Sequence, residues 1–221
     1  MEKKKRLTRA FFARDGITVA RELLGKILVH ETPLGTVRGI ITETEAYMGE
    51  EDKGSHTYGG RRTDRTEPMY HKGGTSYVYL IYGMYSCMNI AAMREDIPQA
   101  VLLRSVIPAD AQSERIMLDL RLAPLNQKRK RAGKEPYTLT GVPINQEKLP
   151  ASLKKHLADG PGKLCIAMGI SRSDNDVDMT KSKEFYVTEG QEIRTEEIKA
   201  GKRIGIDYAG EAADYLWRFY L

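Results

Sequence analysis

Two β-rich segments that flank a short aromatic tip are the feature of this sequence that most restricts its fold. Residues 76–81 and 86–93 are rich in β-branched, aromatic and other apolar side chains, and residues 82–85 (YGMY) separate them. Two such runs around a turn that contains glycine predict a β-hairpin. Exposed aromatic side chains are unfavourable on a narrow turn, so the tip either folds back to complete the core or inserts into a partner. This segment alone leaves both alternatives open.

The remaining apolar patterns predict short strands and a few helices. Thr8 is typical of a helix N-cap, and Asp110 is expected to begin another helix. No repeat and no domain boundary is evident, so residues 1–221 are expected to form a single domain. The expected class is α/β of the α+β type, with a mostly antiparallel curved sheet, a protruding β-hairpin and surrounding helices. The other expected elements are helices at 18–24 and 160–168 and strands at 26–32, 36–47, 100–106, 185–187, 203–206 and 216–220.

The composition favours a globular protein without a metal or a cofactor. The chain has 221 residues but only two cysteines and four histidines, which leaves little material for a disulfide scaffold or a metal cluster. No stretch approaches the ~18 apolar residues that cross a bilayer. The basic N-terminus is followed by no apolar segment of the kind found in signal peptides. We therefore expect a cytoplasmic monomer with no membrane association, no cofactor and no obligate protein partner.

The net charge of +5 at pH 7 permits a polyanionic partner. Lysine and arginine gain affinity for nucleic acid because they release counterions from phosphates. A merely basic surface explains the same charge equally well. The run KRKR at residues 128–131, with Lys134 close behind, raises the same question. Such a run is usually a solvated face or a flexible loop and less often a phosphate-contacting patch.

A pair of carboxylates precedes a long polar segment. Side chains two residues apart on a strand share one face, so Glu43, Glu45 and Tyr47 are expected to point the same way. Paired glutamates on an exposed sheet edge would explain this pattern structurally. The functional interpretation is favoured because residues 48–75, which follow directly, are polar and rich in glycine. Long loops in compact domains are frequent places for active-site residues.

The polar segment holds one histidine, His56, and the arginines Arg61, Arg62 and Arg65. A lone histidine in a loop is more often exposed to solvent than catalytic. The arginines suit phosphate binding, but they suit solubility as well. The tip at 82–85, if it does not fold back, could act as a wedge that enters a DNA groove and separates two stacked bases.

Two further features could interact with charge. Arg104 ends an apolar run, and an arginine at the end of a buried strand needs a carboxylate partner. A structural salt bridge there is compatible with a functional role. The sequence GPGK at 160–163 lies at an expected helix start, where backbone N–H groups attract anions. A phosphate contact by Lys163 and a plain helix N-terminus both fit, whereas the spacing excludes a nucleotide P-loop.

These segments together resemble the alkyladenine (3-methyladenine) DNA glycosylase family. The resemblance runs in order from about Leu7 to the C-terminus, with an interruption near residues 119–158, and its most specific stretch is 77–89. The segments that carry it are TETEAY at 42–47, His56, GGTSYVYLIYGMYSCMN at 73–89, VLLR at 101–104, GPGKLC at 160–165, RIGI at 203–206, AGE at 209–211 and WRFY at 217–220.

The resemblance implies a monofunctional glycosylase of DNA base-excision repair, without lyase activity, whose partner is double-stranded DNA containing damaged purines. Such an enzyme flips the damaged base out of the duplex and hydrolyses its N-glycosidic bond, which leaves an abasic site. The expected substrates are 3-methyladenine and 7-methylguanine, with hypoxanthine and ethenoadenine as further candidates.

The resemblance also implies roles for individual residues. Glu45 would be the general base that deprotonates the attacking water, while Arg104 and the backbone carbonyl of Ile204 would hold that water. Tyr82 would intercalate into the gap that the flipped base leaves in the duplex. The base pocket would be formed by Tyr47, His56, Tyr79 and Asn89. Contacts to the DNA backbone are expected from Arg61, Arg62, Arg65 and Lys163.

Three departures from the family pattern restrict this transfer. Residues 64–66 (DRT) stand where the pattern has an Arg-Asn pair, Leu216 replaces a proline, and residues 128–134 have no evident counterpart. Two other functions also stay open. A nucleoside hydrolase would need neither a wedge nor a basic DNA face. A non-catalytic nucleic-acid-binding module would have no pocket beside a Glu45–Arg104 pair.

Overall fold

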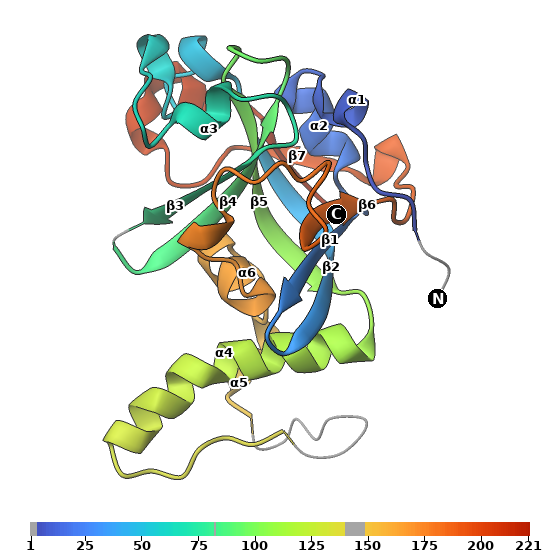
Figure 1. The fold of residues 1–221 in the computed structure, drawn as a ribbon. Helices are drawn as coiled ribbons and strands as arrows, with labels where there is room; N and C mark the ends of the chain where they lie inside the picture. The colour runs from blue at the N-terminus through green and yellow to red at the C-terminus, as the bar shows by residue number, and fades with distance from the viewer. Residues whose placement is uncertain (1–3, 82, 140–148) are drawn as a thin grey trace.

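The computed structural model describes residues 4–81, 83–139 and 149–221. An eight-stranded sheet with antiparallel pairings forms the centre of the fold, and helices surround it (Figure 1). The strand order is β3-β4-β5-β2-β1-β6, and β8 pairs with both β2 and β7. The sheet curls into a half-barrel. The predicted α+β class, the mostly antiparallel curved sheet and the hairpin are therefore confirmed.

The bounds of the elements follow the predicted order closely. The strands are β1 (Ile27–Thr32), β2 (Gly35–Tyr47), β3 (Ser76–Ile81), β4 (Tyr85–Ala92), β5 (Gln99–Pro108), β6 (Phe185–Thr188), β7 (Lys199–Gly201) and β8 (Arg218–Tyr220). The α-helices are α1 (Arg9–Phe12), α2 (Gly16–Glu22), α3 (Glu67–Tyr70), α4 (Ala111–Arg131), α5 (Ala151–Lys155) and α6 (Pro161–Met168). The 3-10 helices are η1 (Gly49–Glu51), η2 (Tyr58–Gly60), η3 (Arg172–Asp174), η4 (Thr195–Glu197) and η5 (Asp207–Asp214).

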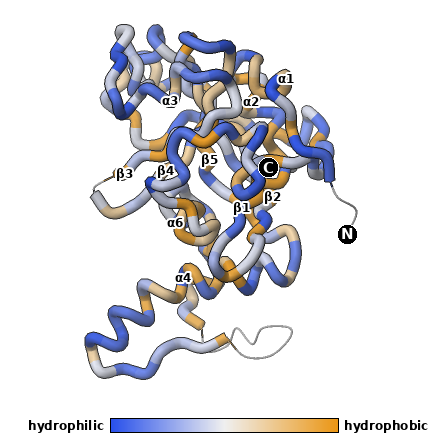
Figure 2. Tube along the Cα trace, viewed as in Figure 1, coloured by the Kyte–Doolittle hydropathy of each residue, from blue (hydrophilic) through white to orange (hydrophobic). Residues whose placement is uncertain are grey.

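One face of the sheet forms the hydrophobic core. Alternate residues of β3, β4 and β5, such as Val78, Met88 and Leu103, are fully buried in one cluster with side chains from α2 and α6. Apolar burial of this kind stabilises the fold by roughly 25 cal/mol per Å² removed from water. The apolar colouring of Figure 2 concentrates on these central strands and on α6. The opposite face of the same strands is left for polar side chains.

Helix boundaries agree with the expected capping residues in part. The Asp110 carboxylate accepts a hydrogen bond from the backbone N–H of Ser113 at 2.7 Å, which caps α4 as predicted. Thr8 precedes α1 but makes no side-chain capping hydrogen bond. The helix expected at 18–24 begins two residues earlier, because Asp15 is its cap and accepts from the backbone N–H of Thr18.

One expected strand is corrected, and two other segments contain helical turns. Residues 203–206 are not a strand, because the Arg203 side chain turns into a buried ion pair and Gly205 has φ +80°. The basic run at 128–131 forms the last turn of α4, which is a solvated face, one of the structural alternatives expected for it. The polar segment 48–75 contains η1, η2 and α3. Among the described residues, no helix is long and apolar enough to cross a membrane.

The tip of the β3–β4 hairpin does not fold back onto the core. Leu80 is 45% exposed, Met84 72% and Tyr85 44%. The hairpin projects from the body of the molecule (Figure 1). Tyr82, the residue expected to intercalate, lies outside the described residues. The exposure of its neighbours makes the hairpin tip an apolar surface that is available to a partner.

Candidate active site

The polar face of the sheet brings two expected site residues, Asn89 and Glu45, into one row with Tyr77 and Leu102. Tyr77 on β3 pairs with Asn89 on β4, Asn89 pairs with Leu102 on β5, and Leu102 pairs with Glu45 on β2. Directly paired residues of antiparallel strands point to the same face. Four side chains that are far apart in the sequence therefore lie side by side on the face opposite the core.

Further site residues flank this row on both of its sides. Tyr79 lies two residues after Tyr77 and pairs with Cys87 on one side of the row. Tyr47 lies two residues after Glu45 and pairs with Ala100 on the other side. Both keep the face of the row, because side chains two residues apart on a strand point the same way. Arg104 lies on that face as well. Register shifts on both sides of Glu43 leave Arg104 outside the ladder between β2 and β5, and its guanidinium contacts the carboxylates of both Glu43 and Glu45. The predicted common orientation of Glu43, Glu45 and Tyr47 is confirmed.

The Glu45 carboxylate is fully buried and receives three donors. Its Oε1 accepts from the backbone N–H of Ile204 at 2.8 Å and lies 3.3 Å from Arg104 Nη1. Its Oε2 accepts from the Tyr47 hydroxyl at 2.8 Å. A carboxylate has about four lone-pair directions, so one remains for a further donor such as water.

The environment of Glu45 shifts its protonation equilibrium. Burial raises the pKa of Glu45 above its usual value, while Arg104, the Ile204 N–H and the Tyr47 hydroxyl oppose that shift. Burial also raises the pKa of Tyr47 well above its usual value, so its hydroxyl keeps its proton and acts as a donor. A carboxylate with a raised pKa is a stronger proton acceptor than a free one, as a general base requires.

Aromatic rings form a second part of the site. His56 lies edge-on to Tyr79 with ring centroids 4.7 Å apart, and its Nδ1 is 2.9 Å from the Tyr77 hydroxyl. The rings of Tyr77 and Tyr79 are 5.2 Å apart. Tyr77 and Tyr79 therefore form an aromatic wall on β3, and His56 extends it.

A cavity of about 300 Å³ joins the two parts of the site. This volume lies at the lower end of the range of small-ligand pockets. The Glu45 side chain is fully buried and does not itself line the cavity. Its three partners, Tyr47, Arg104 and Ile204, do line the cavity. The other lining residues include His56, Tyr77, Tyr79, Asn89 and Arg65.

Comparison with known proteins decides the family. The model of the methylpurine-DNA glycosylase family matches residues 10–221. The chain belongs to this family. Its curated relatives, provisionally named 3-methyladenine DNA glycosylases, include proteins of Clostridium acetobutylicum, Desulfitobacterium hafniense and Clostridium perfringens (strain SM101) that are 45%, 44% and 43% identical to it. Each alignment covers 98% of this chain and 94 or 95% of the relative.

Membership in the methylpurine-DNA glycosylase family confirms the resemblance noted in the sequence. It makes the chain a DNA glycosylase, a class of hydrolases in base-excision repair. Among the described residues, no group of three histidine, cysteine, aspartate or glutamate side chains could hold a metal ion.

A buried ion pair that the sequence did not indicate holds the Ile204 loop. Both side chains of Asp52 and Arg203 are fully buried, and Arg203 Nη2 donates to Asp52 Oδ1 at 2.8 Å. The Arg203 guanidinium also lies between the rings of Tyr47 and Trp217, at 4.8 and 4.9 Å from their centroids. This pair fixes the backbone next to Ile204 and supports one wall of the glycosylase pocket. Asp52 and Arg203 are 151 residues apart in the sequence, so no local motif indicates this pair.

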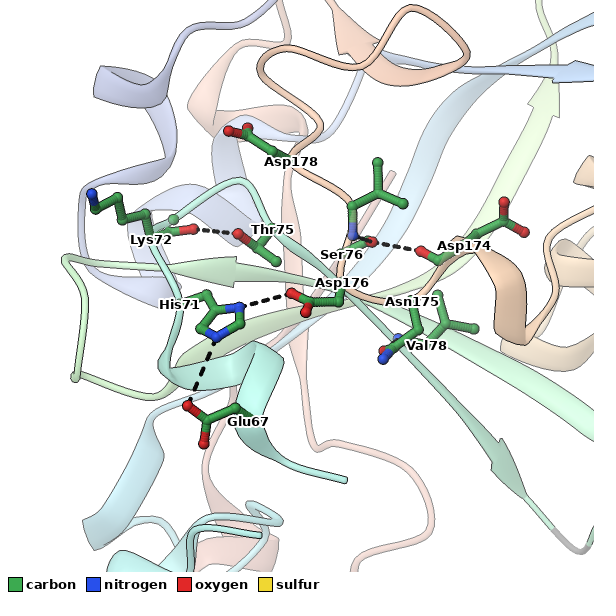
Figure 3. A network of polar contacts seen from close by, with 12 residues as sticks. Glu67, His71, Lys72, Thr75, Ser76, Val78, Asp174, Asn175, Asp176 and Asp178 are labelled. Atoms are coloured by element: carbon green, nitrogen blue, oxygen red, sulfur yellow. Dashed lines mark hydrogen bonds and ion pairs between the residues drawn. The ribbon is translucent and has the colours of Figure 1, made fainter. Parts of the chain in front are cut away.

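A polar network anchors the aromatic strand β3 (Figure 3). His71 Nδ1 is 2.7 Å from Asp176 Oδ1, and Ser76 Oγ donates to the backbone carbonyl of Asp174 at 2.6 Å. The backbone N–H of Val78 donates to Asn175 Oδ1 at 2.8 Å. These contacts tie the start of β3 to residues 174–178, so the Tyr77 and Tyr79 rings stand on a fixed strand.

The basic residues expected at the DNA backbone differ in their surroundings. Arg62 forms ion pairs with Glu67 and Asp96 at 2.6 and 2.7 Å, and Lys163 pairs with Asp159 at 3.0 Å. Arg65 lies 5.2 Å above the Tyr79 ring and lines the pocket. Arg61 lines a neighbouring depression together with Arg65. Of these four arginine and lysine side chains, Arg61 and Arg65 are the better placed to meet a phosphate near the pocket mouth.

His56 is expected to make folding depend on pH. Burial and the cations Arg65 and Arg61 lower the pKa of His56 to about 4. The folded state therefore resists protonation, and the stability from neutral His56 is present above pH ~6.5 and is lost as the pH falls toward 4. Between pH 8 and pH 5, the wild type should lose about 2 kcal/mol more than His56→Gln. Urea unfolding at both pH values measures this, and equal losses in the two proteins would contradict it.

Proposed function

We propose that this glycosylase excises alkylated purines from duplex DNA by hydrolysis, with Glu45 as the general base. The observation that carries the proposal is the buried Glu45 carboxylate, whose three donors all line the pocket and leave one acceptor direction for a water. Arg104 and the carbonyl of Ile204 are proposed to hold that water. A non-catalytic module would not need a buried general base beside a cavity.

Access of the water requires a small movement of Tyr47. Its hydroxyl donates to Oε2 of Glu45 and covers that oxygen. We infer that the Tyr47 ring shifts toward a bound base and thereby opens the path from the cavity to the carboxylate. The raised pKa of Glu45 then favours transfer of the water proton to it.

The aromatic residues are proposed to hold the flipped base. Tyr47 and His56 would lie on its two faces, Tyr79 would meet its edge and Asn89 would line the pocket. Bases alkylated at N3 or N7 are cationic, and stacking of a cation on an aromatic ring contributes about 0.5–2 kcal/mol. Because the pKa of His56 is about 4, its ring is neutral near pH 7 and does not repel such a base.

The chemistry of the leaving group suits a site with one general base. A cationic purine leaves readily through an oxocarbenium-like transition state, so no dedicated general acid is needed. We propose 3-methyladenine and 7-methylguanine as the main substrates, and hypoxanthine and ethenoadenine, which leave less readily, as weaker ones. Among the described residues that line the pocket there is no lysine, which supports hydrolysis without a Schiff base and without strand cleavage.

Extrusion of the base needs a group that fills the gap in the duplex. We propose that Tyr82 does this, carried by the exposed hairpin tip. Unstacking a base requires a few kcal/mol, and less for a damaged base. The exposed neighbours Met84 and Tyr85 support a tip that enters the groove. We further propose that the protein acts as a monomer in the cytoplasm.

Base release from defined duplexes tests the proposal. Each duplex carries one 7-methylguanine, 3-methyladenine or hypoxanthine, and an undamaged duplex is the control. Free base and alkali-sensitive abasic sites are expected from the first two, without strand breaks before alkali. Binding without release of any base would overturn the catalytic claim and leave a DNA-binding module. Release from free nucleosides at the same rate as from duplexes would indicate a nucleoside hydrolase instead.

A further inference from the structure

The far end of α4 projects beyond the body of the molecule (Figure 1). A helix of 21 residues is about 31 Å long. Its first half is anchored, since Ile116, Met117, Leu118 and Leu122 are buried. The projecting end of α4 is coloured mainly as hydrophilic in Figure 2. A second apolar cluster, in which Leu125 packs beside Leu122, extends along this part of α4. Apolar burial there does not account for the basic residues that follow.

The projecting end has a defined structure, because the chain turns back and binds to it. Asn126 Nδ2 donates to the carbonyl of Tyr137 at 2.9 Å, and the Tyr137 N–H donates to Asn126 Oδ1 at 2.8 Å. The Arg129 guanidinium lies 4.2 Å from the centroid of the Tyr137 ring and donates to the carbonyl of Glu135. We call residues 126–139 the basic arm.

The basic arm gathers positive charge that has no partner in the described part of the chain. Lys128, Lys130, Arg131 and Lys134 are exposed, and none of them forms an ion pair among residues 4–81, 83–139 and 149–221. Elsewhere on the surface, lysines are commonly paired with a carboxylate. Examples of such paired lysines are Lys26, Lys53, Lys163 and Lys202.

Stabilisation of the helix end alone does not account for four cations. The C-terminus of a helix carries roughly half a negative charge, which one or two nearby cations can complement for about 0.3–1 kcal/mol each. Further like charges at neighbouring positions repel one another and are destabilising. A bound polyanion would neutralise these like charges and so relieve their repulsion. The surface is therefore suited to bind a polyanion.

We propose that the basic arm is a second contact with duplex DNA, on the phosphates to one side of the damaged base. This proposal rests on the proposed function for the identity of the substrate. The end of α4 and the β3–β4 hairpin both extend toward the left in Figure 1, and we infer that one duplex contacts both. No residue of the arm lines the pocket, so the phosphates that it contacts are proposed to lie away from the flipped base.

Neutralising the arm tests the proposal on undamaged duplex. In the test variant, glutamine, which keeps helix propensity, replaces Lys128, Lys130, Arg131 and Lys134. Each phosphate contact contributes about 0.9 to the slope of log K against log salt, so the slope should fall by about 2–4. At moderate salt, binding should weaken about 10- to 100-fold. The control variant replaces the lysines near the N-terminal segment, Lys4, Lys5, Lys181 and Lys183, by glutamine and should change binding far less.

A damaged duplex of unequal arms tests the geometry. In one duplex the lesion lies about 4 base pairs from the 5′ end of its strand and about 12 from the 3′ end. In a second duplex these two flank lengths are exchanged. The wild type should bind one orientation at least 5-fold more tightly, and the arm variant should lose that preference. Single-turnover base release at saturating enzyme should be unchanged in the arm variant, because the pocket is intact.

The outcomes separate the arm from the active site. Equal losses of affinity in the arm and control variants, or the same slope in all three proteins, would overturn the proposal. Failure of the wild type to release a damaged base would refute the proposed function instead. It would leave the salt slopes on undamaged duplex to decide whether the arm binds DNA.

Discussion

Replacement of Glu45 by glutamine is expected to slow base release by about 10²- to 10⁴-fold, the usual contribution of a general base. The amide has the same shape but cannot take a proton from water. Arg104 keeps a carboxylate partner in Glu43, at 3.0 Å, so the pocket should retain its form. DNA binding is therefore expected to stay within a few-fold of the wild type.

Single-turnover kinetics at saturating enzyme, with binding measured on the same duplex, check this expectation. Glu43→Gln is the matched control, because it removes the same charge two residues away on the same face. Its carboxylate contacts Arg104 and Arg218 but not the Tyr47 hydroxyl or the Ile204 N–H. A loss below about 10-fold is expected for it. Equal losses in both variants would assign the two carboxylates a joint electrostatic role and remove Glu45 as the base.

Loss of the Asp52 carboxylate should have the largest effect on stability. In Asp52→Ala, the buried Arg203 guanidinium loses its counter-ion, and the removal of one partner of a buried pair lowers the free energy of unfolding by about 3–5 kcal/mol. Asp52 also accepts from the backbone N–H groups of Met48 and Gly54, at 3.0 and 2.9 Å. The variant therefore leaves further buried donors without a partner.

Urea unfolding followed by the fluorescence of Trp217, the single tryptophan, measures this change. Trp217 packs on Arg203 and so reports on the pair directly. Glu189→Ala is the control, since it breaks an exposed ion pair with Lys26 and should lower the free energy of unfolding by less than about 1 kcal/mol. A loss of similar size in both variants would show that the buried pair does not hold the structure together.

Local patterns predicted the elements that follow a simple period. Alternation along residues 36–47 predicted the common face of Glu43, Glu45 and Tyr47, and the run before Arg104 predicted its need for a carboxylate. The hairpin at 76–93 was equally clear, because both strands are apolar and a glycine turn joins them. These features depend on neighbours in the sequence, so a single sequence contains them.

Features that depend on distant contacts were missed. The segment 203–206 has the composition of a strand, yet the ion pair of Arg203 with Asp52 and the positive φ of Gly205 take it out of the sheet. No spacing rule connects Asp52 with Arg203. The shift of Arg104 out of the ladder likewise depends on how β2 and β5 pair. The basic run at 128–131 lacks the apolar residues at helical spacing that indicate a helix. The sequence therefore did not predict that α4 extends through it.

The row from Tyr77 through Asn89 and Leu102 to Glu45 restricts how this chain can change in length. A slip of one residue turns every side chain of a strand to the other face. Tyr77 and Asn89 would then enter the core, and Val78 and Met88 would line the pocket. One inserted or deleted residue in β3, β4 or β5 thus damages folding and catalysis together, so viable length changes in these strands should come in compensating pairs.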